Sequence, residues 1–426
     1  MKRVLVISYY WPPSGGSGVQ RWVKFSKYLP SEGWQPVIYT PENPELSAVD
    51  DTLAGEIPPE VEVIKRPILE PYGIYRKLTG KKGGSEVNAI NSSKKKSISL
   101  FIRGNFFIPD PRCFWIEPSV KFLKKYVAEH PVDVIVSTAP PHSMHLIARK
   151  LSLATGIPWI ADFRDPWTKM FYFKHLGLTK FSEWRHHKLE KKVLDDATVI
   201  VSVSPFVQRE FKEMTSTPVA LVTNGYDEDD FEGPAEKDGF FNITHTGLFS
   251  KDGNPENLWT VLGEMKRRDD KFASLLRIRL VGKTDGEVLD SIREAGLWEN
   301  VVNLGYQPHK TAVAEQCRAS FLILPIRMEP ESKSVLPGKI FEYLASRRPI
   351  LGIDDKDGAM AGIINEKNAG EVKNWEDKEG IGDFVERHWN AFLKGCDLYN
   401  GKDVSEYSRR NLSKKMAQIM NEITVK

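Results

Sequence analysis

The sequence predicts an α/β fold made of two Rossmann-like domains, each with a doubly wound parallel sheet. Several short runs are continuously apolar, such as VLVI at 4–7 and SFLILP at 320–325, and this pattern is typical of parallel strands buried on both faces. Most of these runs lead through a turn into a stretch with helical periodicity. The chain has 426 residues, which suits two cores of roughly 200 residues better than one.

The composition is that of a soluble globular protein, with 41% hydrophobic and 27% charged residues. A formal net charge of +3 is too small to indicate a nucleic-acid partner, and none is expected. Cys113, Cys317 and Cys396 are scattered, without metal-binding or disulfide spacing, so we expect a reducing compartment and no metal. The apolar run after Met1 is too short for a signal sequence, and none reaches the roughly 18 residues that span a bilayer. Cytoplasmic residence is therefore expected.

The first half of the chain alternates strands and helices. We expect strands at 3–8, 36–40, 132–138, 158–161, 198–202 and 219–222, and helices at 19–29, 145–154, 183–195 and 205–214. After an acidic, linker-like segment at 228–239 the pattern starts again. In the second half we expect strands at 241–246, 277–281, 301–305 and 320–325, a helix from Pro337, and helices at 388–393 and 405–423.

A glycine-rich turn follows the first strand. Gly15 and Gly16 lie in the loop 9–18, where a backbone without side chains can approach a ligand closely. It is not the dinucleotide fingerprint, because Arg21 stands where the third glycine belongs and the strand 36–40 ends without an acidic residue. The sequence therefore argues against NAD, and a connector without a ligand stays open.

Two later loops carry polar side chains. His142 follows the strand 132–138, and Arg164 and Asp165 follow the strand 158–161. Ligands of open α/β sheets gather at the carboxyl ends of strands, so these loops point to one edge. A purely structural role, in which the adjacent opposite charges fix a loop, remains the alternative.

The segment PGKIFEYLASRRPIL at 337–351 predicts a helix with one core face and one wet face. Pro337 suits the first helical position. The core face is expected to hold Ile340, Phe341, Leu344 and Ala345, and the wet face Lys339, Glu342 and Ser346. The preceding Leu336 cannot cap the helix, so first-turn N–H groups could hold a phosphate. The alternative is a surface helix on which Lys339 and Glu342 pair with each other.

Four segments carry a family resemblance: PGKIFEYLASRRPIL, STAPPHS, IPWIADFRDPW and NGYD. They resemble the retaining glycosyltransferases of family 4, in particular those that build bacterial surface polysaccharides. The resemblance implies the GT-B fold, two Rossmann-like domains facing across a cleft. It also implies that the last helix crosses back to the first domain. We thus expect an acceptor-side domain at 1–225, joined by the helix 405–426, and a nucleotide-sugar-binding domain at 226–404.

The resemblance also assigns the donor-binding residues. Glu342 would hold the ribose of a nucleotide-sugar, and the turn at Pro337 and Gly338 would hold its phosphates. Gly247 would lie at the pyrophosphate, Tyr306 at the base, and Gly15 and Gly16 at the cleft. Many relatives have Arg directly after the glycine at 247, and this chain has Leu248, so Lys283 or Lys339 must supply the positive charge that a departing phosphate needs.

Two other positions depart from the family pattern. The first Glu of the usual Glu-x7-Glu motif would fall at Ser334, which leaves Glu329 or Glu331 as substitutes. The catalytic-region His is replaced by Arg164 and Asp165, with His142 as the nearest alternative.

The resemblance implies a metal-independent hexosyltransferase with a nucleotide-sugar donor and a glycan or lipid-linked acceptor, and without a cofactor. Two alternatives remain open. One is a sugar-nucleotide epimerase on the same fold, and the other is a non-catalytic nucleotide-sugar-binding subunit, which Ser334 and Leu248 favour.

A basic stretch next to aromatic residues indicates a peripheral membrane contact. Lys94, Lys95 and Lys96 precede SISLFIRGNFFI, so residues 94–107 could hold the enzyme at the inner face of the cell membrane, near a lipid-linked acceptor. The alternative is a solvated loop whose apolar end packs on the domain.

Overall fold

The structure is a computed structural model that describes residues 1–15, 17–45, 49–70, 101–231, 237–328 and 333–425. The predictions made for Gly16, for Lys94–Lys96 and for Glu329 and Glu331 fall outside these residues. The chain divides into two compact units, Met1–Thr223 with Arg409–Lys426, and Asn224–Ser408. The domain boundaries expected from the sequence fall after residues 225 and 404.

The first unit is built around a parallel sheet of seven strands. They are β1 (Lys2–Ile7), β2 (Trp34–Pro41), β3 (Glu62–Arg66), β4 (Val134–Ala139), β5 (Trp159–Phe163), β6 (Val199–Ser202) and β7 (Val219–Leu221). Its helices are α1 (Ser17–Tyr28), α4 (Ile116–Glu129), α5 (Ser143–Thr155), α6 (Lys180–Asp196), α7 (Pro205–Met214) and α15 (Arg409–Thr424). The strand order is β3-β2-β1-β4-β5-β6-β7.

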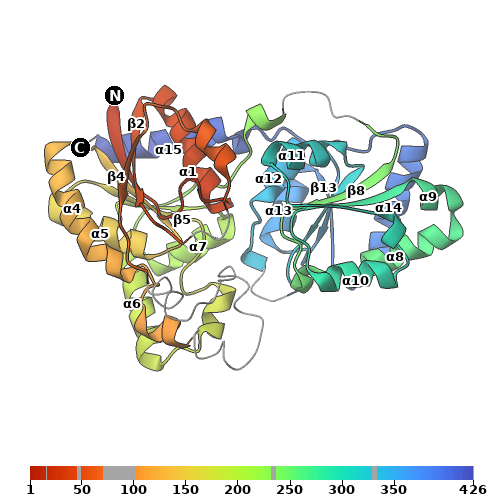
Figure 1. Ribbon diagram of the computed structural model, residues 1–426, viewed down its shortest axis with the longest axis horizontal. Helices are drawn as coiled ribbons and strands as arrows, with labels where there is room; N and C mark the ends of the chain where they lie inside the picture. The colour runs from red at the N-terminus through yellow and green to blue at the C-terminus, as the bar shows by residue number, and fades with distance from the viewer. Residues whose placement is uncertain (16, 46–48, 71–100, 232–236, 329–332, 426) are drawn as a thin grey trace. The chain divides into compact units, whose positions relative to one another are not determined.

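The strand β1 shows why this sheet must be covered on both faces. Leu5 and Ile7 pack into one hydrophobic cluster, and Val4 and Val6 pack into another. Side chains alternate across a strand, so an uninterrupted apolar run needs a core on each side. The C-terminal helix α15 supplies part of the second core, in which Met416 and Met420 are buried. Figure 1 shows α15 alongside α1, at the opposite end of the sequence.

The second unit repeats the plan with six parallel strands. They are β8 (Phe241–Thr246), β9 (Leu276–Val281), β10 (Val301–Gly305), β11 (Phe321–Pro325), β12 (Ile350–Ile353) and β13 (Gly370–Lys373). Its helices are α8 (Glu256–Arg268), α9 (Asp270–Leu275), α10 (Gly286–Glu294), α11 (His309–Arg318), α12 (Lys339–Ala345), α13 (Ala359–Lys367) and α14 (Lys378–Leu393). The strand order is β10-β9-β8-β11-β12-β13.

The strand order of the second unit places its ligand-binding edge. The chain moves outward from β8 to β9 and β10, then returns to the other side of β8 with β11. Ligands of such sheets bind beyond the carboxyl ends of strands at this reversal. The loop that starts at Gly247 and the segment that leads from β11 to α12 both leave the sheet at this edge.

Several local expectations need correction. The helix predicted from Pro337 begins at Lys339 with Gly338 as its N-cap residue, and the N–H of Ile340 donates to the carbonyl oxygen of Pro337. Ser346, expected on the wet face, is buried at the C-terminal end of α12, where its hydroxyl donates to the carbonyl oxygen of Tyr343. In the described part of the chain, no helix is long and apolar enough to cross a membrane.

Candidate functional site

Three glycines end neighbouring strands at the ligand-binding edge of the second unit. Gly247, Gly282 and Gly305 follow or end β8, β9 and β10 with positive φ angles of 89°, 121° and 61°. The N–H of Gly247 donates to Val281 O at 2.7 Å, and the N–H of Gly282 donates to Gly305 O at 2.7 Å. A Cβ on Gly282 would overlap the carbonyl oxygen of Gly247. Glycine is therefore required here, and the edge presents bare backbone.

Lys339 places its ammonium group beside this backbone. Its Nζ donates to Thr246 O at 2.9 Å and contacts His245 Nε2 at 2.8 Å. A Cβ on Gly247 would lie 3.7 Å from the same Nζ. Lys339 thus bonds to β8 rather than to Glu342, which excludes the simple surface pairing considered from the sequence. Of the two candidate cations, Lys339 is the one beside Gly247.

Burial changes the protonation of both partners. Desolvation lowers the pKa of Lys339 to about 7, against the opposing effect of the Glu342 carboxylate. Desolvation and, secondarily, the Lys339 ammonium hold the pKa of His245 well below its ordinary value. His245 is therefore neutral, and its Nε2 accepts the hydrogen bond from Lys339.

Glu342 lies one turn after Lys339 and is held by a side chain of α11. Its Oε2 accepts a hydrogen bond from Gln316 Nε2 at 3.0 Å, and the same amide nitrogen donates to Thr246 Oγ1 at 3.1 Å. Oε1 of Gln316 is buried and has no hydrogen-bond partner among the described residues. The amide thus fixes one oxygen of Glu342, Oε2, and does not contact the other, Oε1.

A histidine approaches that second oxygen. His309 Nε2 lies 3.9 Å from Glu342 Oε1 and 3.1 Å from Asp230 Oδ2. His309 and Gln316 are two turns apart, at either end of α11, and so share one face of it. The carboxylate of Glu342 is therefore surrounded by polar side chains, those of Gln316 and His309 from α11 and that of Thr246 from β8.

Four further predicted donor residues, and Leu248, lie at this edge and range from half-buried to exposed. Tyr306 follows β10 and is 70% exposed, and Leu248 is 49% exposed. Lys283 follows β9 and is exposed, while its carbonyl oxygen accepts the N–H of Phe249 at 2.9 Å. Pro337 and Gly338 directly precede α12. All of these residues belong to the second unit.

In the first unit, Arg164 ties three loops together. Its Nη1 donates to Gly18 O at 2.9 Å, and its Nη2 donates to Pro140 O. Its guanidinium also lies 5.5 Å from the ring centroid of Tyr10. Arg164 thus joins the ends of β1, β4 and β5. Gly15, in the first of these loops, is buried.

Asp165 and His142 lie near this guanidinium and have shifted pKa values. Burial raises the pKa of Asp165, although the adjacent Arg164 opposes the shift. Burial holds the pKa of His142 well below its ordinary value, with smaller effects from His145, His186 and Arg164. The His142 ring stacks on Trp167 with centroids 4.5 Å apart. The structure gathers the three predicted catalytic residues at one sheet edge, and their catalytic role stays a prediction.

The structure explains why Arg21 replaces a glycine. Arg21 is fully buried and donates to both carboxylate oxygens of Asp162, at 2.8 and 3.0 Å. It also donates to the carbonyl oxygens of Val222 and Thr223. In a dinucleotide-binding fold a glycine at this position lets the helix pack closely against the sheet. Here the buried guanidinium of Arg21 and its partners occupy that space between helix and sheet.

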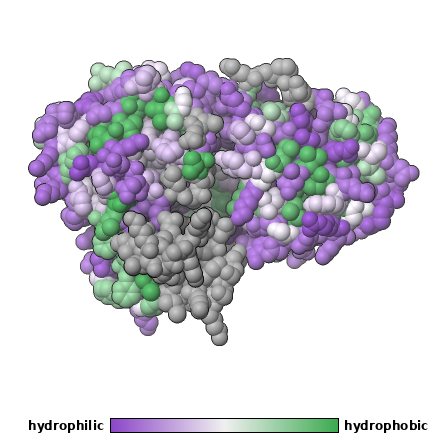
Figure 2. Space-filling model, viewed as in Figure 1, coloured by the Kyte–Doolittle hydropathy of each residue, from purple (hydrophilic) through white to green (hydrophobic). Residues whose placement is uncertain are grey.

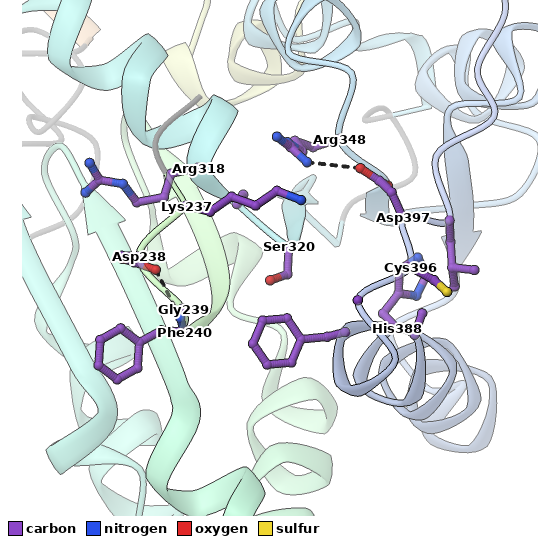
Figure 3. Close-up of a pocket in the computed structure, with 15 residues that line it drawn as sticks. Lys237, Asp238, Gly239, Phe240, Arg318, Ser320, Arg348, His388, Cys396 and Asp397 are labelled. Carbon is purple, nitrogen blue, oxygen red and sulfur yellow. Dashed lines mark hydrogen bonds and ion pairs between the residues drawn. The ribbon is translucent and has the colours of Figure 1, made fainter. Parts of the chain in front are cut away.

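The second unit also contains a cavity of about 180 Å³ at the other edge of its sheet. It is lined by Phe240 and Ser320, which precede β8 and β11, and by Arg348, which precedes β12. Figure 3 shows Arg348 directed toward Asp397, to which it donates at 3.1 Å. This cavity lies opposite the edge that carries Gly247, so it is separate from the predicted donor site.

His245, Gln316 and His309 were not singled out from the sequence. Two turns separate His309 from Gln316, and this spacing was the available signal for a shared face. The sequence around His245 has no feature that indicates a functional residue, because His245 is one of the buried residues of β8. As for metals, the described residues contain no group of three or more His, Cys, Asp or Glu side chains arranged to bind one.

A family comparison and a structural comparison can now be added. The family model described as Glycosyltransferase Family 4 matches residues 89–230. A search of curated proteins finds no match. Solved structures with the same fold include a glycosyltransferase from Rickettsia africae, with 15% identity, a TM-score of 0.61, and coverage of 100% of this chain and 99% of that chain.

Two further solved structures extend this comparison. S. aureus TarM, crystallised with fondaparinux, alpha-GlcNAc-glycerol and UDP, has 11% identity, a TM-score of 0.61, and coverage of 99% and 100%. A putative UDP-N-acetylglucosamine 2-epimerase from Listeria monocytogenes has 9% identity, a TM-score of 0.60, and coverage of 100% and 97%. These likenesses confirm the predicted GT-B fold, with its two parallel sheets. The family model covers residues 89–230, which is less than half of the 426 residues.

Proposed function

We propose that this chain is a retaining, metal-independent hexosyltransferase that moves a sugar from a nucleotide-sugar to a glycan or lipid-linked acceptor. The observation that carries the proposal is the position of Lys339 and Glu342, one turn apart on α12 at the switch-point edge of the second unit. One side chain presents an ammonium group to bare backbone, and the other presents a carboxylate oxygen one turn away. A nucleoside diphosphate offers the matching groups, two phosphates and a ribose diol.

In this proposal each group of the site has one task. Lys339 neutralises the diphosphate, and the backbone at Gly247, Pro337 and Gly338 allows it to approach closely. Glu342 accepts a hydrogen bond from a ribose hydroxyl while Gln316 holds its other oxygen. Tyr306 flanks the base, and Lys283 is a second, exposed cation at the rim.

The chemistry then depends on charge and position. When the bond between sugar and phosphate breaks, negative charge develops on the leaving diphosphate, and a fixed ammonium group stabilises it. The acceptor hydroxyl attacks the sugar from the face that the diphosphate leaves. Arg164, Asp165 and His142 are proposed to act on the acceptor side, and Gly15 and Gly16 are proposed to bind the donor. His142 is neutral at physiological pH because burial lowers its pKa, so its ring can take part in hydrogen bonding without carrying a charge.

The setting proposed for this reaction is the synthesis of cell-surface polysaccharide at the cytoplasmic side of the cell membrane. The support is the resemblance of the segments STAPPHS and IPWIADFRDPW to enzymes of that kind.

A direct experiment separates this function from its two alternatives. The purified protein is incubated with UDP-, GDP- and ADP-sugars, and nucleotide release, sugar interconversion and binding are measured. Release that increases with added acceptor supports the transferase. Interconversion without release would identify an epimerase, which the likeness to the Listeria monocytogenes structure keeps as the second candidate. Binding without either reaction would identify a non-catalytic subunit.

A further inference from the structure

The first unit exposes a set of large apolar side chains at one place on its surface. They come from the helical stretch 101–106 and from the start of α6, and we refer to them as the aromatic face: Phe101, Ile102, Phe106, Phe181 and Trp184. Phe106 is 72%, Phe181 63% and Trp184 53% exposed. Large apolar side chains that gather on a surface mark an interaction site more often than single ones do.

Hydrogen bonds connect the stretch 101–106 to the segment at the start of α6. Asn105 accepts the N–H of Thr179, the N-cap residue of α6, at 2.7 Å and donates to Gly177 O at 3.2 Å. Gly104 packs so closely on Leu178 that a Cβ there would lie 2.6 Å from a methyl group of that side chain. The stretch 101–106 is thus fixed against the start of α6, which holds its exposed residues beside Phe181 and Trp184. Figure 2 shows hydrophobic side chains on this lower part of the first unit.

The rest of the exposed face of α6 is mostly basic. Its exposed charged residues are Lys180, Arg185, Lys188, Lys191 and Lys192 on the positive side and Glu183, Asp195 and Asp196 on the negative side. Asp195 is paired with Lys191, and Asp196 is paired with Arg149. Lys188 lies 4.5 Å from the ring centroid of Trp184. The helix therefore leads from two exposed aromatic side chains directly into a run of cations, while Ser182, His186 and Val193 are buried on its inner face.

We propose that the aromatic face and the basic side chains of α6 form a docking surface for the anionic surface of a lipid bilayer. Aromatic side chains partition into the headgroup region, and cations next to them attract anionic lipids. Charge complementarity selects this occupant. Apart from the ion pairs Lys191–Asp195 and Arg149–Asp196, the exposed face of α6 has four cations and one carboxylate, Glu183. The proposed contact includes α6 as well as residues 101–106, whereas the sequence pointed only to residues 94–107.

Vesicle sedimentation tests this proposal without any donor or acceptor, so its result does not depend on the proposed function. The full chain is mixed with vesicles of phosphatidylglycerol and phosphatidylcholine, or of phosphatidylcholine alone. We expect binding to the anionic vesicles that weakens as salt is raised. The double variants Phe181→Ser/Trp184→Ser and Arg185→Glu/Lys188→Glu should each bind at least tenfold more weakly.

A matched control comes from the second unit. Trp298 is 44% exposed and has the guanidinium of Arg293 4.0 Å from its ring centroid, so it resembles Trp184 in exposure and in its cation contact. Trp298→Ser should bind the vesicles like the unchanged protein, and thermal unfolding should show that all variants fold. Unchanged vesicle binding by both double variants would overturn the proposal. The proposal would also be overturned if the chain formed a dimer in solution that buries the aromatic face.

Discussion

The ammonium nitrogen of Lys339 lies 2.8 Å from Nε2 of the buried His245. Two positive charges at this distance would repel each other, and the low pKa of His245 removes one of them. The neutral ring accepts a hydrogen bond and fixes the direction of the lysine side chain. The result is one cation held at the end of β8, beside the backbone of Gly247.

Donor binding should therefore depend on pH. The pKa of Lys339 is lowered to about 7 by burial, so the free protein loses this charge as pH rises through 7. A bound diphosphate favours the charged form and raises the pKa. Affinity should thus be highest below pH 7 and should fall above it, by up to about tenfold per pH unit. Calorimetry with a nucleotide-sugar between pH 6 and 9 measures this, because such a donor lacks the terminal phosphate that itself titrates near about pH 6.

Variants at the two candidate cations identify the group responsible. Lys339→Met should weaken binding at pH 6.5 and remove the pH dependence, whereas Lys339→Arg should keep the affinity and flatten the profile, since arginine stays charged. Lys283→Met, at an exposed position, should change little. A strong effect at Lys283 with none at Lys339 would reverse the assignment.

Glu342→Ala should weaken donor binding at least tenfold. The carboxylate is held by Gln316 at 3.0 Å, and its loss removes a hydrogen bond to a charged group, worth about 1.5–3 kcal/mol. Isothermal calorimetry measures the change. Glu264→Ala, in the exposed part of α8, serves as the control for loss of a carboxylate. Unchanged affinity in the Glu342 variant would show that this residue does not reach the ribose.

Gly282→Ala should destabilise the second unit more than Gly305→Ala. Both residues have positive φ angles, 121° and 61°, and therefore both alanine variants are strained, at about 1–3 kcal/mol. Only at Gly282 does the added Cβ overlap the backbone of Gly247, while at Gly305 nothing lies within 4 Å. Urea denaturation of the two variants measures the difference. Equal midpoints would mean that the Gly247 loop moves aside at no cost.

The fold could be predicted because buried parallel strands appear in the sequence as apolar runs. Three strands were not predicted. β3 (EVIKR) and β13 (GEVK) are partly exposed edge strands without such a run, and the buried run ILGI of β12 was taken only as the end of the segment that contains the helix from Pro337. At the site, Lys339 and Glu342 were found because they share one motif. His245 and Gln316 were missed because they reach Lys339 and Glu342 from β8 and α11, and a single sequence does not contain the register of those elements.

Buried charge was equally invisible in the sequence. Arg21 was noted only as a departure from a glycine pattern, whereas the structure gives it four hydrogen bonds, to Asp162 and to two carbonyl oxygens. The sequence contains nothing that pairs residue 21 with residue 162, because α1 and β5 are far apart in the chain and are brought together only by the tertiary fold.

Asp354→Asn should stabilise the protein above pH 6. Asp354 directly follows β12 and is fully buried. Its carboxylate oxygens have no well-formed hydrogen bond within the described part of the chain, only a weaker interaction with the N–H of Asp355. Desolvation raises its pKa to about 6. Between the unfolded pKa of about 3.9 and this value, the folded chain holds a proton that the unfolded chain has released. Stability is therefore lost as pH rises through this window and stays lower above it.

Asparagine does not titrate, so the advantage of the Asp354→Asn variant should be near zero at pH 3.5 and reach on the order of 2 kcal/mol above pH 6.5. Urea denaturation across this range measures it. The neighbour Asp355 is the matched control with the opposite sign, because its ion pair with Lys333 at 2.7 Å lowers its pKa. Asp355→Asn should lower stability at pH 7 and have no effect at low pH. If Asp354→Asn instead destabilised the fold at pH 7, the ionised carboxylate would have to be paired, and the raised pKa would be wrong.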